Sequence, residues 1–197
     1  MMTLSVDRSD IRALRNSLGK AQGKMLGQLA SAVNKTAKYV QSQKAKDINR
    51  EITVTQKEIK KGVKLVFATK KTLTAVSILN AERRPSLKRF KGTKQNARGV
   101  EYQIKRGGGK QLVPHAFMGP RPGKIASKLG GHAFMRVGKS RTPIVKLHGV
   151  SPWAVFVKNQ MDKSILIKAD KRLSKEIREK VRVNVLRASG LIKSGRR

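Results

Sequence analysis

The side chains that could carry out acid–base chemistry are few and widely separated in this sequence. Acidic residues stop at Glu101 and resume only at Asp162, although the interval contains eleven Lys and Arg residues. Carboxylate pairs for general acid–base catalysis, or for binding two metal ions, therefore cannot form within this middle region. Only the two ends of the chain could contribute them. The sequence predicts that the protein is not a hydrolase and, more broadly, not an enzyme.

The three histidines are the next candidates for chemistry. His115, His132 and His148 lie 17 and 16 residues apart, and the sequence contains no cysteine that could complete a zinc site. Ordinary surface or interface histidines are the favoured interpretation, and a sparse histidine site for a metal is the alternative. We expect no metal and no cofactor.

Two glycine-containing segments could bind phosphate through backbone amides. The segment 138–140 matches the end of a phosphate-binding loop, but that motif requires glycine where Ala133 stands, so we reject it. The segment 107–109 consists of three glycines and is followed by Lys110. It could cradle a phosphate, although a flexible hairpin turn explains it equally well.

Positive charge is the strongest chemical signal. The 197 residues include 46 Lys and Arg against 11 Asp and Glu, which gives a formal net charge of +35. Such a surface repels itself until a polyanion neutralises it, so a nucleic acid or an acidic protein is the expected partner. With 38% hydrophobic residues the chain can still build a core. It has no apolar stretch that could span a membrane and no secretory signal, so we expect a soluble protein made in the cytoplasm.

No motif in the sequence indicates that bases are read. There is no zinc finger, basic zipper or recognition helix, and the eight aromatic residues are scattered. We therefore expect duplex DNA to be bound through its phosphates, without sequence preference, by the segment 82–98 and the region 105–128. The segment 82–98 is predicted to be a mobile basic loop. The residues predicted to contact DNA or a neighbouring subunit are Arg83, Arg84, Lys88, Arg89, Lys91, Lys94, Arg98, Lys110, Arg121, Lys124, Arg136, Lys139 and Arg141.

Hydrophobic spacing predicts helices at both ends of the chain and strands between them. Apolar residues recur every three or four positions over 11–46 and over 165–185. Thr55 and Glu58 form a capping-box pattern for a short helix, and Ser151 followed by Pro152 predicts another. The predicted strands are 63–69, 72–79, 100–105, 111–118 and 143–147. The tetrapeptide 115–118 recurs at 132–135, which favours two strands with similar faces toward one core.

We therefore predict an α+β fold in which long N-terminal and C-terminal helices flank an antiparallel sheet of about four to five strands. One domain is expected over 1–197, in which residues 1–61 are helical, residues 62–148 are rich in strands, and residues 149–197 are helical and end in a basic tail. Gly19, Gly23 and Gly27 lie four residues apart on the first helix. They are expected to let another helix, or a neighbouring subunit, approach closely.

The segment 114–153 is the most distinctive stretch of the sequence. It contains Pro114, Ala116, Phe117, Gly131, His132, Phe134, Arg136, Gly138, Lys139, Arg141, Pro143, Ile144, Lys146, Leu147, Gly149, Val150, Ser151 and Pro152. This pattern resembles the signature of the phage minor tail protein Z family, where an Ala-Phe strand, a basic strand and a short helix follow one another. The flanking elements come in a similar order, so the resemblance covers most of the chain, with 136–151 as its most specific segment. The sequence departs from the family after Gly149, where Pro-Ser-Val is common.

The resemblance implies a structural virion protein of a long-tailed bacteriophage, assembled in the host cytoplasm. It implies tail completion near the head–tail junction as a homo-oligomeric ring, with six subunits expected and other tail or neck proteins as neighbours. It implies no enzymatic activity. A strongly positive ring could line the passage through which genomic DNA runs. The alternative is a ribosomal or other RNA-binding protein, because small basic α+β proteins without cysteine are common in that class.

Overall fold

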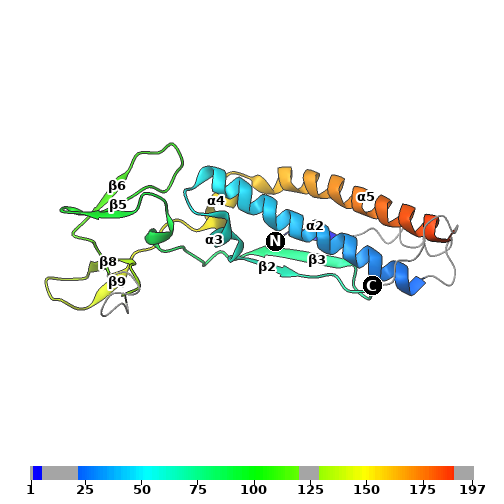
Figure 1. Cartoon of the computed structure of the whole chain (residues 1–197). Coiled ribbons are helices and arrows are strands. Elements are labelled where there is room, and N and C mark those ends of the chain that lie inside the picture. Colours follow the sequence, from blue (N-terminus) through cyan, green and yellow to red (C-terminus); the bar gives the residue numbers. More distant parts are fainter. Residues whose placement is uncertain (1, 6–21, 120–128, 189–197) are drawn as a thin grey trace. The chain divides into compact units, whose positions relative to one another are not determined.

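A computed structural model of the chain describes residues 2–5, 22–119 and 129–188 (Figure 1). The chain divides into two units, and each of them combines segments that are distant in the sequence. Unit 1 comprises Met1–Gln43, Lys64–Ile78 and Asp162–Arg197. Unit 2 comprises Lys44–Val63 and Leu79–Met161. The predicted division of a single domain into the regions 1–61, 62–148 and 149–197 stays a prediction.

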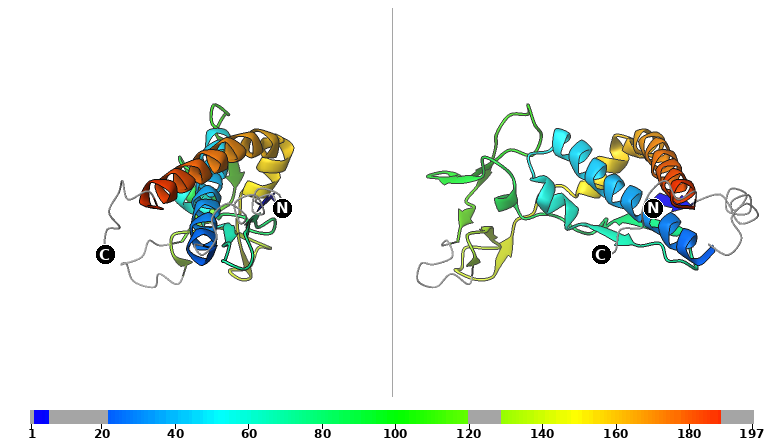
Figure 2. Two further views of the ribbon diagram at one scale, coloured as in Figure 1. Left: turned by 90° about the vertical axis from the view of Figure 1, so that its right-hand side faces the viewer. Right: turned by 45° about the vertical axis from the view of Figure 1, so that its right-hand side comes forward.

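Unit 1 is built from two long helices and a small antiparallel sheet. The helices are α2 (Gln22–Glu51), which belongs to unit 1 as far as Gln43, and α5 (Met161–Ala188). The sheet has the order β1–β3–β2, with β1 at Met2–Ser5, β2 at Val63–Val66 and β3 at Thr74–Leu79. The two helices lie side by side in Figure 1 and stay adjacent in the views of Figure 2. Both predicted terminal helices are thus confirmed within the described residues.

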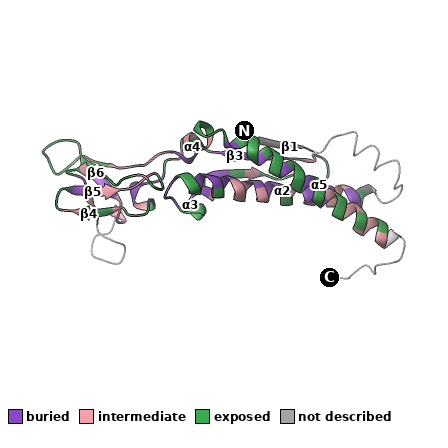
Figure 3. Cartoon of the chain, turned by 90° about the horizontal axis from the view of Figure 1, so that it is seen from above, coloured by how far each residue is buried: buried purple, intermediate pink, exposed green. Residues whose placement is uncertain are grey.

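The packing of unit 1 follows the helical period. On α2 the side chains of Leu29, Val33, Ala37 and Val40 are almost fully buried, and on α5 a four-residue repeat begins at Ile165 (Figure 3). Polar side chains join the two helices as well. The Lys35 ammonium lies 3.4 Å from the Glu176 carboxylate, the Asn184 amide donates to Gln28, and the Arg172 guanidinium lies over the Tyr39 ring.

Asn34 on α2 fixes the chain after β2. Its side-chain amide donates to the carbonyl of Ala68 over 2.9 Å and accepts from the backbone N–H of Ala68 over 2.7 Å. This pair of hydrogen bonds satisfies both backbone groups of one residue that lies outside the sheet ladder. None of the helices in the described residues is long and apolar enough to cross a membrane.

Unit 2 contains two short helices and two small sheets. The helices are α3 (Gln56–Lys60) and α4 (Pro152–Lys158), and a 3₁₀ turn, η2, covers Leu87–Arg89. One sheet has the order β4–β5–β6, from Lys94–Asn96, Gly99–Tyr102 and Gln111–Pro114. The other has the order β7–β8–β9, from Phe117–Met118, Ala133–Arg136 and Ile144–Lys146. The predicted hairpin, β5 with β6, is confirmed, and Pro114 lies on β6, an edge strand of this sheet, where its missing N–H interrupts no ladder.

The two copies of the repeated tetrapeptide lie on neighbouring strands. Phe117 of β7 is opposite Phe134 of β8, and their ring centroids are 6.1 Å apart. Ala133 is fully buried and Phe134 is nearly so. The repeat therefore forms one continuous apolar contact across a strand pair, which agrees with the predicted role of the two copies.

The α+β class is confirmed, but the prediction of one antiparallel sheet of four to five strands is wrong. The described residues form three sheets of three strands each. The reason is visible in the predicted strand 111–118, which divides into β6 and β7. His115 has a φ of 57°, and the N–H of Ala116 donates back to the carbonyl of Val113, so the chain turns at this point. Each half of the predicted strand then joins a different sheet.

The segment 82–98, predicted to be a mobile basic loop, is not an irregular loop. The segment contains η2 and β4, and Ser86, Leu87 and Phe90 are buried. Backbone hydrogen bonds hold it on both sides, from Leu87 to the carbonyl of Leu147 over 3.1 Å and from Lys91 to the carbonyl of Thr53 over 3.4 Å. The two large apolar residues of the segment, Leu87 and Phe90, anchor it, because both side chains enter the core of unit 2.

Lys44 is a buried cation in unit 2. Its side chain is 2% exposed, and its Nζ lies 5.5 Å from the centroid of the Phe156 ring. Burial lowers the pKa of Lys44 from 10.5 to about 8, since a charged ammonium loses its hydration there. Lys44 is therefore a cation that the fold tolerates at a cost in stability.

Replacing Lys44 with Met should raise the free energy of unfolding at pH 7 by about 1 kcal/mol, because the Met side chain has a similar volume and no charge to desolvate. Between pH 8 and 10.5 the unfolded chain keeps the Lys44 proton while the folded chain loses it, so wild-type stability should rise with pH across this window. The Lys44→Met variant should lack this component of the rise. Urea unfolding at several pH values measures both effects. Lys46→Met is the control, because Lys46 is exposed on the same helix. A less stable Lys44→Met variant would contradict the prediction.

Candidate functional site

The predicted contact residues fall into groups with different surroundings, and all those that the structure describes lie in unit 2. Arg83, Arg89 and Lys94 form ion pairs. Lys88 donates to the carbonyl of Gly130, and Arg136 lies over the Phe117 ring at 5.5 Å. The remaining residues are exposed and make no ion pair with any described residue, and these are Arg84, Lys91, Arg98, Lys110, Lys139 and Arg141. Arg121 and Lys124 lie outside the described residues.

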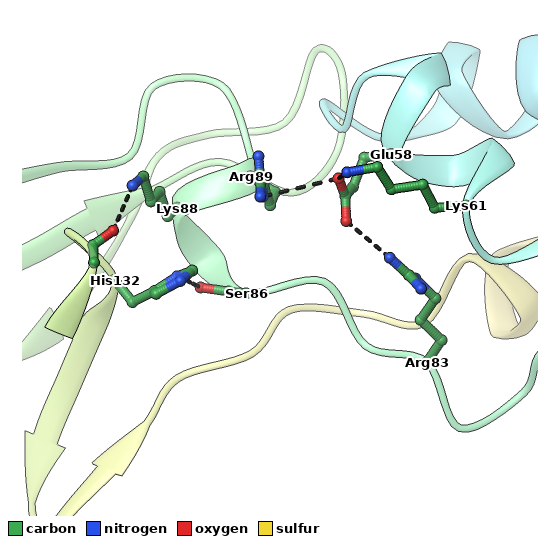
Figure 4. Close-up of polar contacts among 8 residues, drawn as sticks. Glu58, Lys61, Arg83, Ser86, Lys88, Arg89 and His132 are labelled. Carbon is green, nitrogen blue, oxygen red and sulfur yellow. Dashed lines mark hydrogen bonds and ion pairs between the residues drawn. The ribbon is translucent and has the colours of Figure 1, made fainter. Parts of the chain in front are cut away.

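Glu58 of α3 is the centre of the ion-pair cluster (Figure 4). Its carboxylate lies 3.1 Å from the Arg83 guanidinium, 3.4 Å from the Lys61 ammonium and 3.8 Å from Arg89 Nε. Only 11% of the Glu58 side chain is exposed. One acid therefore holds three cations and joins α3 to both ends of the segment 83–89.

The pKa of the Glu58 carboxyl group is set by two opposing effects, burial and the nearby positive charges. Partial burial alone would raise the pKa of the carboxyl group. The hydrogen bonds from Arg83 and Lys61, together with the positive charges of Arg89 and Lys61, outweigh burial and hold the pKa below its ordinary value. Glu58 is therefore ionised at neutral pH, and its charge is compensated by its three neighbours.

The sequence pattern predicts a different role for Glu58, as part of a capping box with Thr55. In a capping box the Thr55 side chain would accept from the backbone of residue 58, but Thr55 makes no such bond, and the N–H of Glu58 donates to the Thr55 carbonyl over 3.0 Å. The Glu58 carboxylate is used by Arg83 and Arg89, which are 25 and 31 residues further along the chain. The only available signal in the sequence was that Glu58 is one of very few acids near a cationic segment.

Ser86 and His132 form a second polar contact in Figure 4. The Ser86 Oγ lies 2.8 Å from His132 Nδ1. Burial lowers the pKa of His132, and the charges of Lys146, Lys88 and Arg89 lower it further. An imidazole whose charged form is disfavoured by burial and by nearby cations is a poor general base for Ser86. No group of three His, Asp or Glu residues within the described ranges could hold a metal ion.

The sheet β7–β8–β9 carries the remaining predicted residues. Met135 of β8 is opposite Val145 of β9, and both side chains are exposed. Ile144 and Leu147, which the sequence marks as apolar, are only half-buried. Lys139 and Arg141 lie on the exposed connection between β8 and β9. The arrangement therefore presents cations beside an apolar strip, without enclosing a reaction site.

Two of the three predicted packing glycines can be placed. Gly23 is exposed on α2, and a Cβ there would meet nothing within 4 Å. At Gly27 a Cβ would lie 3.3 Å from the Cε of Lys70. Gly19 lies outside the described residues. An approach by another helix at Gly23 stays a prediction.

The comparison with known families decides the identity of the chain. The sequence model of prophage minor tail protein Z matches residues 8–189. The chain belongs to this family. No curated protein and no solved structure matches it. As a member of the prophage minor tail protein Z family, the chain is a structural component of a phage tail and thus of the virion. The match gives no support to the alternative of a ribosomal or other RNA-binding protein.

The most specific segment of this family member, 136–151, ends at two residues with clear structural roles. A Cβ at Gly149 would lie 2.3 Å from a carbon of the Phe90 ring, so only glycine fits beneath that ring. Ser151 accepts from the N–H of Trp153 and donates to the carbonyl of Ala81 over 2.9 Å, which starts α4 and ties it to the chain before Arg83. The departure after Gly149 thus leaves a regular N-cap with Pro152 at the first helical position.

Replacing Glu58 with Gln should lower the free energy of unfolding at pH 7 by about 1 to 3 kcal/mol, because three cations lose their shared counter-charge. In the wild type this stabilisation is complete above the ordinary pKa of Glu and is lost as the pH falls through the lower folded-state pKa. The variant should lack this acid-dependent component. Chemical denaturation at pH 7 and across the acid range measures both. Glu82→Gln is the matched control, because Glu82 is exposed and makes no ion pair with a described residue. Equal losses in the two variants would refute the role of Glu58.

Proposed function

We propose that the chain acts in tail completion near the head–tail junction, as a closed homo-oligomeric ring around the DNA passage. In this proposal unit 2 contacts duplex DNA through phosphates and without sequence preference. Membership of the prophage minor tail protein Z family supports a role in the tail. The single observation that carries the DNA contact is the set of exposed cations in unit 2 that have no acidic partner within the described residues.

The distribution of charge supports a polyanionic partner. The residues between Glu101 and Asp162 include no acid, so this stretch of unit 2 cannot neutralise its own cations. Subunits of such a ring would repel one another unless counter-charges lie close by. Genomic DNA in the passage would supply them, and its phosphates would release counterions as the Lys and Arg side chains approach.

The aromatic residues favour binding without sequence preference. Phe90 and Phe134 are buried, and Phe117 is covered by Arg136. Phe67 and Trp153 are exposed, but they belong to different units. The described residues therefore offer no group of aromatic side chains on which successive bases could stack.

The proposed DNA contact predicts a salt dependence that can be assigned to unit 2. Replacing Arg84, Lys91 and Arg98 with Gln should reduce the slope of log affinity against log salt by about 2 to 3, because each phosphate contact contributes about 0.9. All DNA sequences should be weakened equally. Fluorescence anisotropy with duplex oligonucleotides over a range of salt concentrations measures the slope.

The control removes the same charge from unit 1, where Lys163, Lys171 and Lys175 are exposed on α5. Their replacement with Gln should leave the slope nearly unchanged. The same reduction with both sets would mean that only net charge matters, and no reduction with either would mean that unit 2 does not contact DNA. Both results would contradict the proposal.

The proposed ring predicts a defined oligomer, with six subunits expected. Light scattering should give one oligomeric mass, either for the protein alone or in the presence of tail tubes. Gly23→Leu should weaken assembly if helices of neighbouring subunits approach at Gly23, and it should leave the single subunit folded, because a Cβ at Gly23 would meet nothing within 4 Å. A monomeric wild-type protein under both conditions would exclude the ring.

A further inference from the structure

A concave pocket in unit 2 is lined by none of the residues named individually as DNA or subunit contacts, although Lys105 and Arg106 begin the region 105–128 that is expected to bind DNA. It encloses about 270 Å³ between the end of α2, the segment 104–106 and α4. Its walls include five aliphatic side chains, and these are Ile52, Ile104, Val150, Ala154 and Val155. Ile52 is 2% exposed and the other four are half-buried. We call this hollow the aliphatic pocket.

The walls of the aliphatic pocket are held by backbone hydrogen bonds. The N–H of Thr53 donates to the carbonyl of Ile104 over 2.9 Å, and the N–H of Arg106 donates to the carbonyl of Glu51 over 2.9 Å. Ile52 and Lys105 form an antiparallel bridge between these two bonds. The pocket is therefore formed before any ligand binds, which lowers the entropy cost of binding.

The size of the aliphatic pocket indicates what kind of group it accepts. Sites for small-molecule ligands usually enclose roughly 300 to 1,000 Å³, and this pocket is slightly smaller. One large aliphatic or aromatic side chain fits that volume better than a cofactor does. Burying such a side chain against aliphatic walls is favourable in itself, because apolar surface leaves water.

The rim of the aliphatic pocket is positively charged. Lys105, Arg106 and Lys158 are exposed among its lining residues, and Glu51 is the one acid among them. The Arg106 guanidinium is already oriented, since its Nε donates to the carbonyl of Asn49 over 2.6 Å and its Nη2 donates to Asn49 Oδ1 over 3.1 Å. A fixed guanidinium loses little freedom when it binds a carboxylate.

The C-terminal ends of α2 and α4, which carry partial negative charge, do not cancel the positive charge of the rim. The last carbonyls of α2 and α4 would attract cations, but Arg106 donates to the carbonyl of Glu51, and Asn159 donates to the carbonyl of Val155. Lys158 also lies in the last turn of α4, where a cation offsets the helix dipole. Three formal positive charges therefore face a ligand, against the single carboxylate of Glu51.

We propose that the aliphatic pocket binds an acidic segment of a partner protein, which inserts one large apolar side chain between the cations of the rim. Charge selects this occupant. A second copy of the chain offers no acidic segment, because no two of its eleven Asp and Glu residues are adjacent in the sequence, and duplex DNA presents phosphates without an apolar side chain. This inference rests on the proposed function for the presence of neighbouring tail proteins. Its test uses the isolated protein without DNA, so its failure is distinct from a failure of DNA binding.

The test uses labelled peptides of defined chemistry. The first probe is Gly-Glu-Asp-Phe-Asp-Glu-Gly, the second has Ala in place of Phe, and the third has Gln and Asn in place of the acids. The first should bind at least about tenfold more tightly than the second, because its ring is buried. It should also bind more tightly than the third, because the rim is cationic. Equal affinities for the first two peptides would overturn the proposal, since they would indicate binding to the protein's general positive charge.

Variants of the protein locate the binding site. Replacing Lys105 and Lys158 with Gln should weaken the first peptide by about three- to tenfold. The control replaces Lys46 and Lys57, two exposed cations of unit 2 outside the pocket, and should weaken it by less than about twofold. Equal weakening by both pairs would overturn the proposal.

Ala154→Phe should fill the aliphatic pocket and abolish the preference for Phe over Ala in the peptide. Because this variant adds volume to a packed region, its folding needs a separate check by circular dichroism. Methyl NMR of the wild-type protein gives an answer that does not depend on the variant. Adding the first peptide should shift the methyl signals of Ile52, Ile104, Val150 and Val155. Binding that leaves these signals unchanged would place the peptide elsewhere and overturn the proposal.

Discussion

The chain has only eleven Asp and Glu residues to form ion pairs with 46 Lys and Arg residues. This shortage of acid limits how many cations can be neutralised within the fold. Glu58 binds three cations in unit 2, whereas Glu176, which is 3% exposed, binds Lys35 and Arg172 in unit 1. Each of these acids joins segments that are distant in the sequence. These two carboxylates therefore lie where they secure the fold, and within the described residues cations such as Arg84, Lys91 and Arg98 are exposed without an ion pair.

This placement of charge connects the fold with the role of a tail protein. The segment 82–98 is held by backbone hydrogen bonds to Thr53 and Leu147 and by ion pairs with Glu58. Its exposed cations are therefore presented from an ordered surface. Ordered cations bind a polyanion with less loss of side-chain and backbone freedom than a flexible tail would. The phosphates of DNA need no complementary shape beyond this, which suits the proposed position of the chain around the DNA passage.

The elements that follow local rules could be predicted from the sequence. The two long helices follow from the spacing of residues such as Val33, Ala37 and Ile165, and Ser151 starts α4 as its position before Pro152 indicates. The division of the sheet could not be predicted, since it depends on the turn at His115, a residue that adopts positive φ only in particular contexts. The Glu58 cluster and the aliphatic pocket were missed because both depend on contacts between distant segments.

An electron cryomicroscopy map of the intact tail where it meets the head would show whether the chain forms the proposed ring around DNA. We expect a ring in which the exposed cations of unit 2, such as Arg84, Lys91 and Arg98, face the DNA passage. They should lie within about 10 Å of phosphates, the range over which charges interact at physiological salt. A map in which these side chains face the outer surface of the tail, away from DNA, would contradict this expectation.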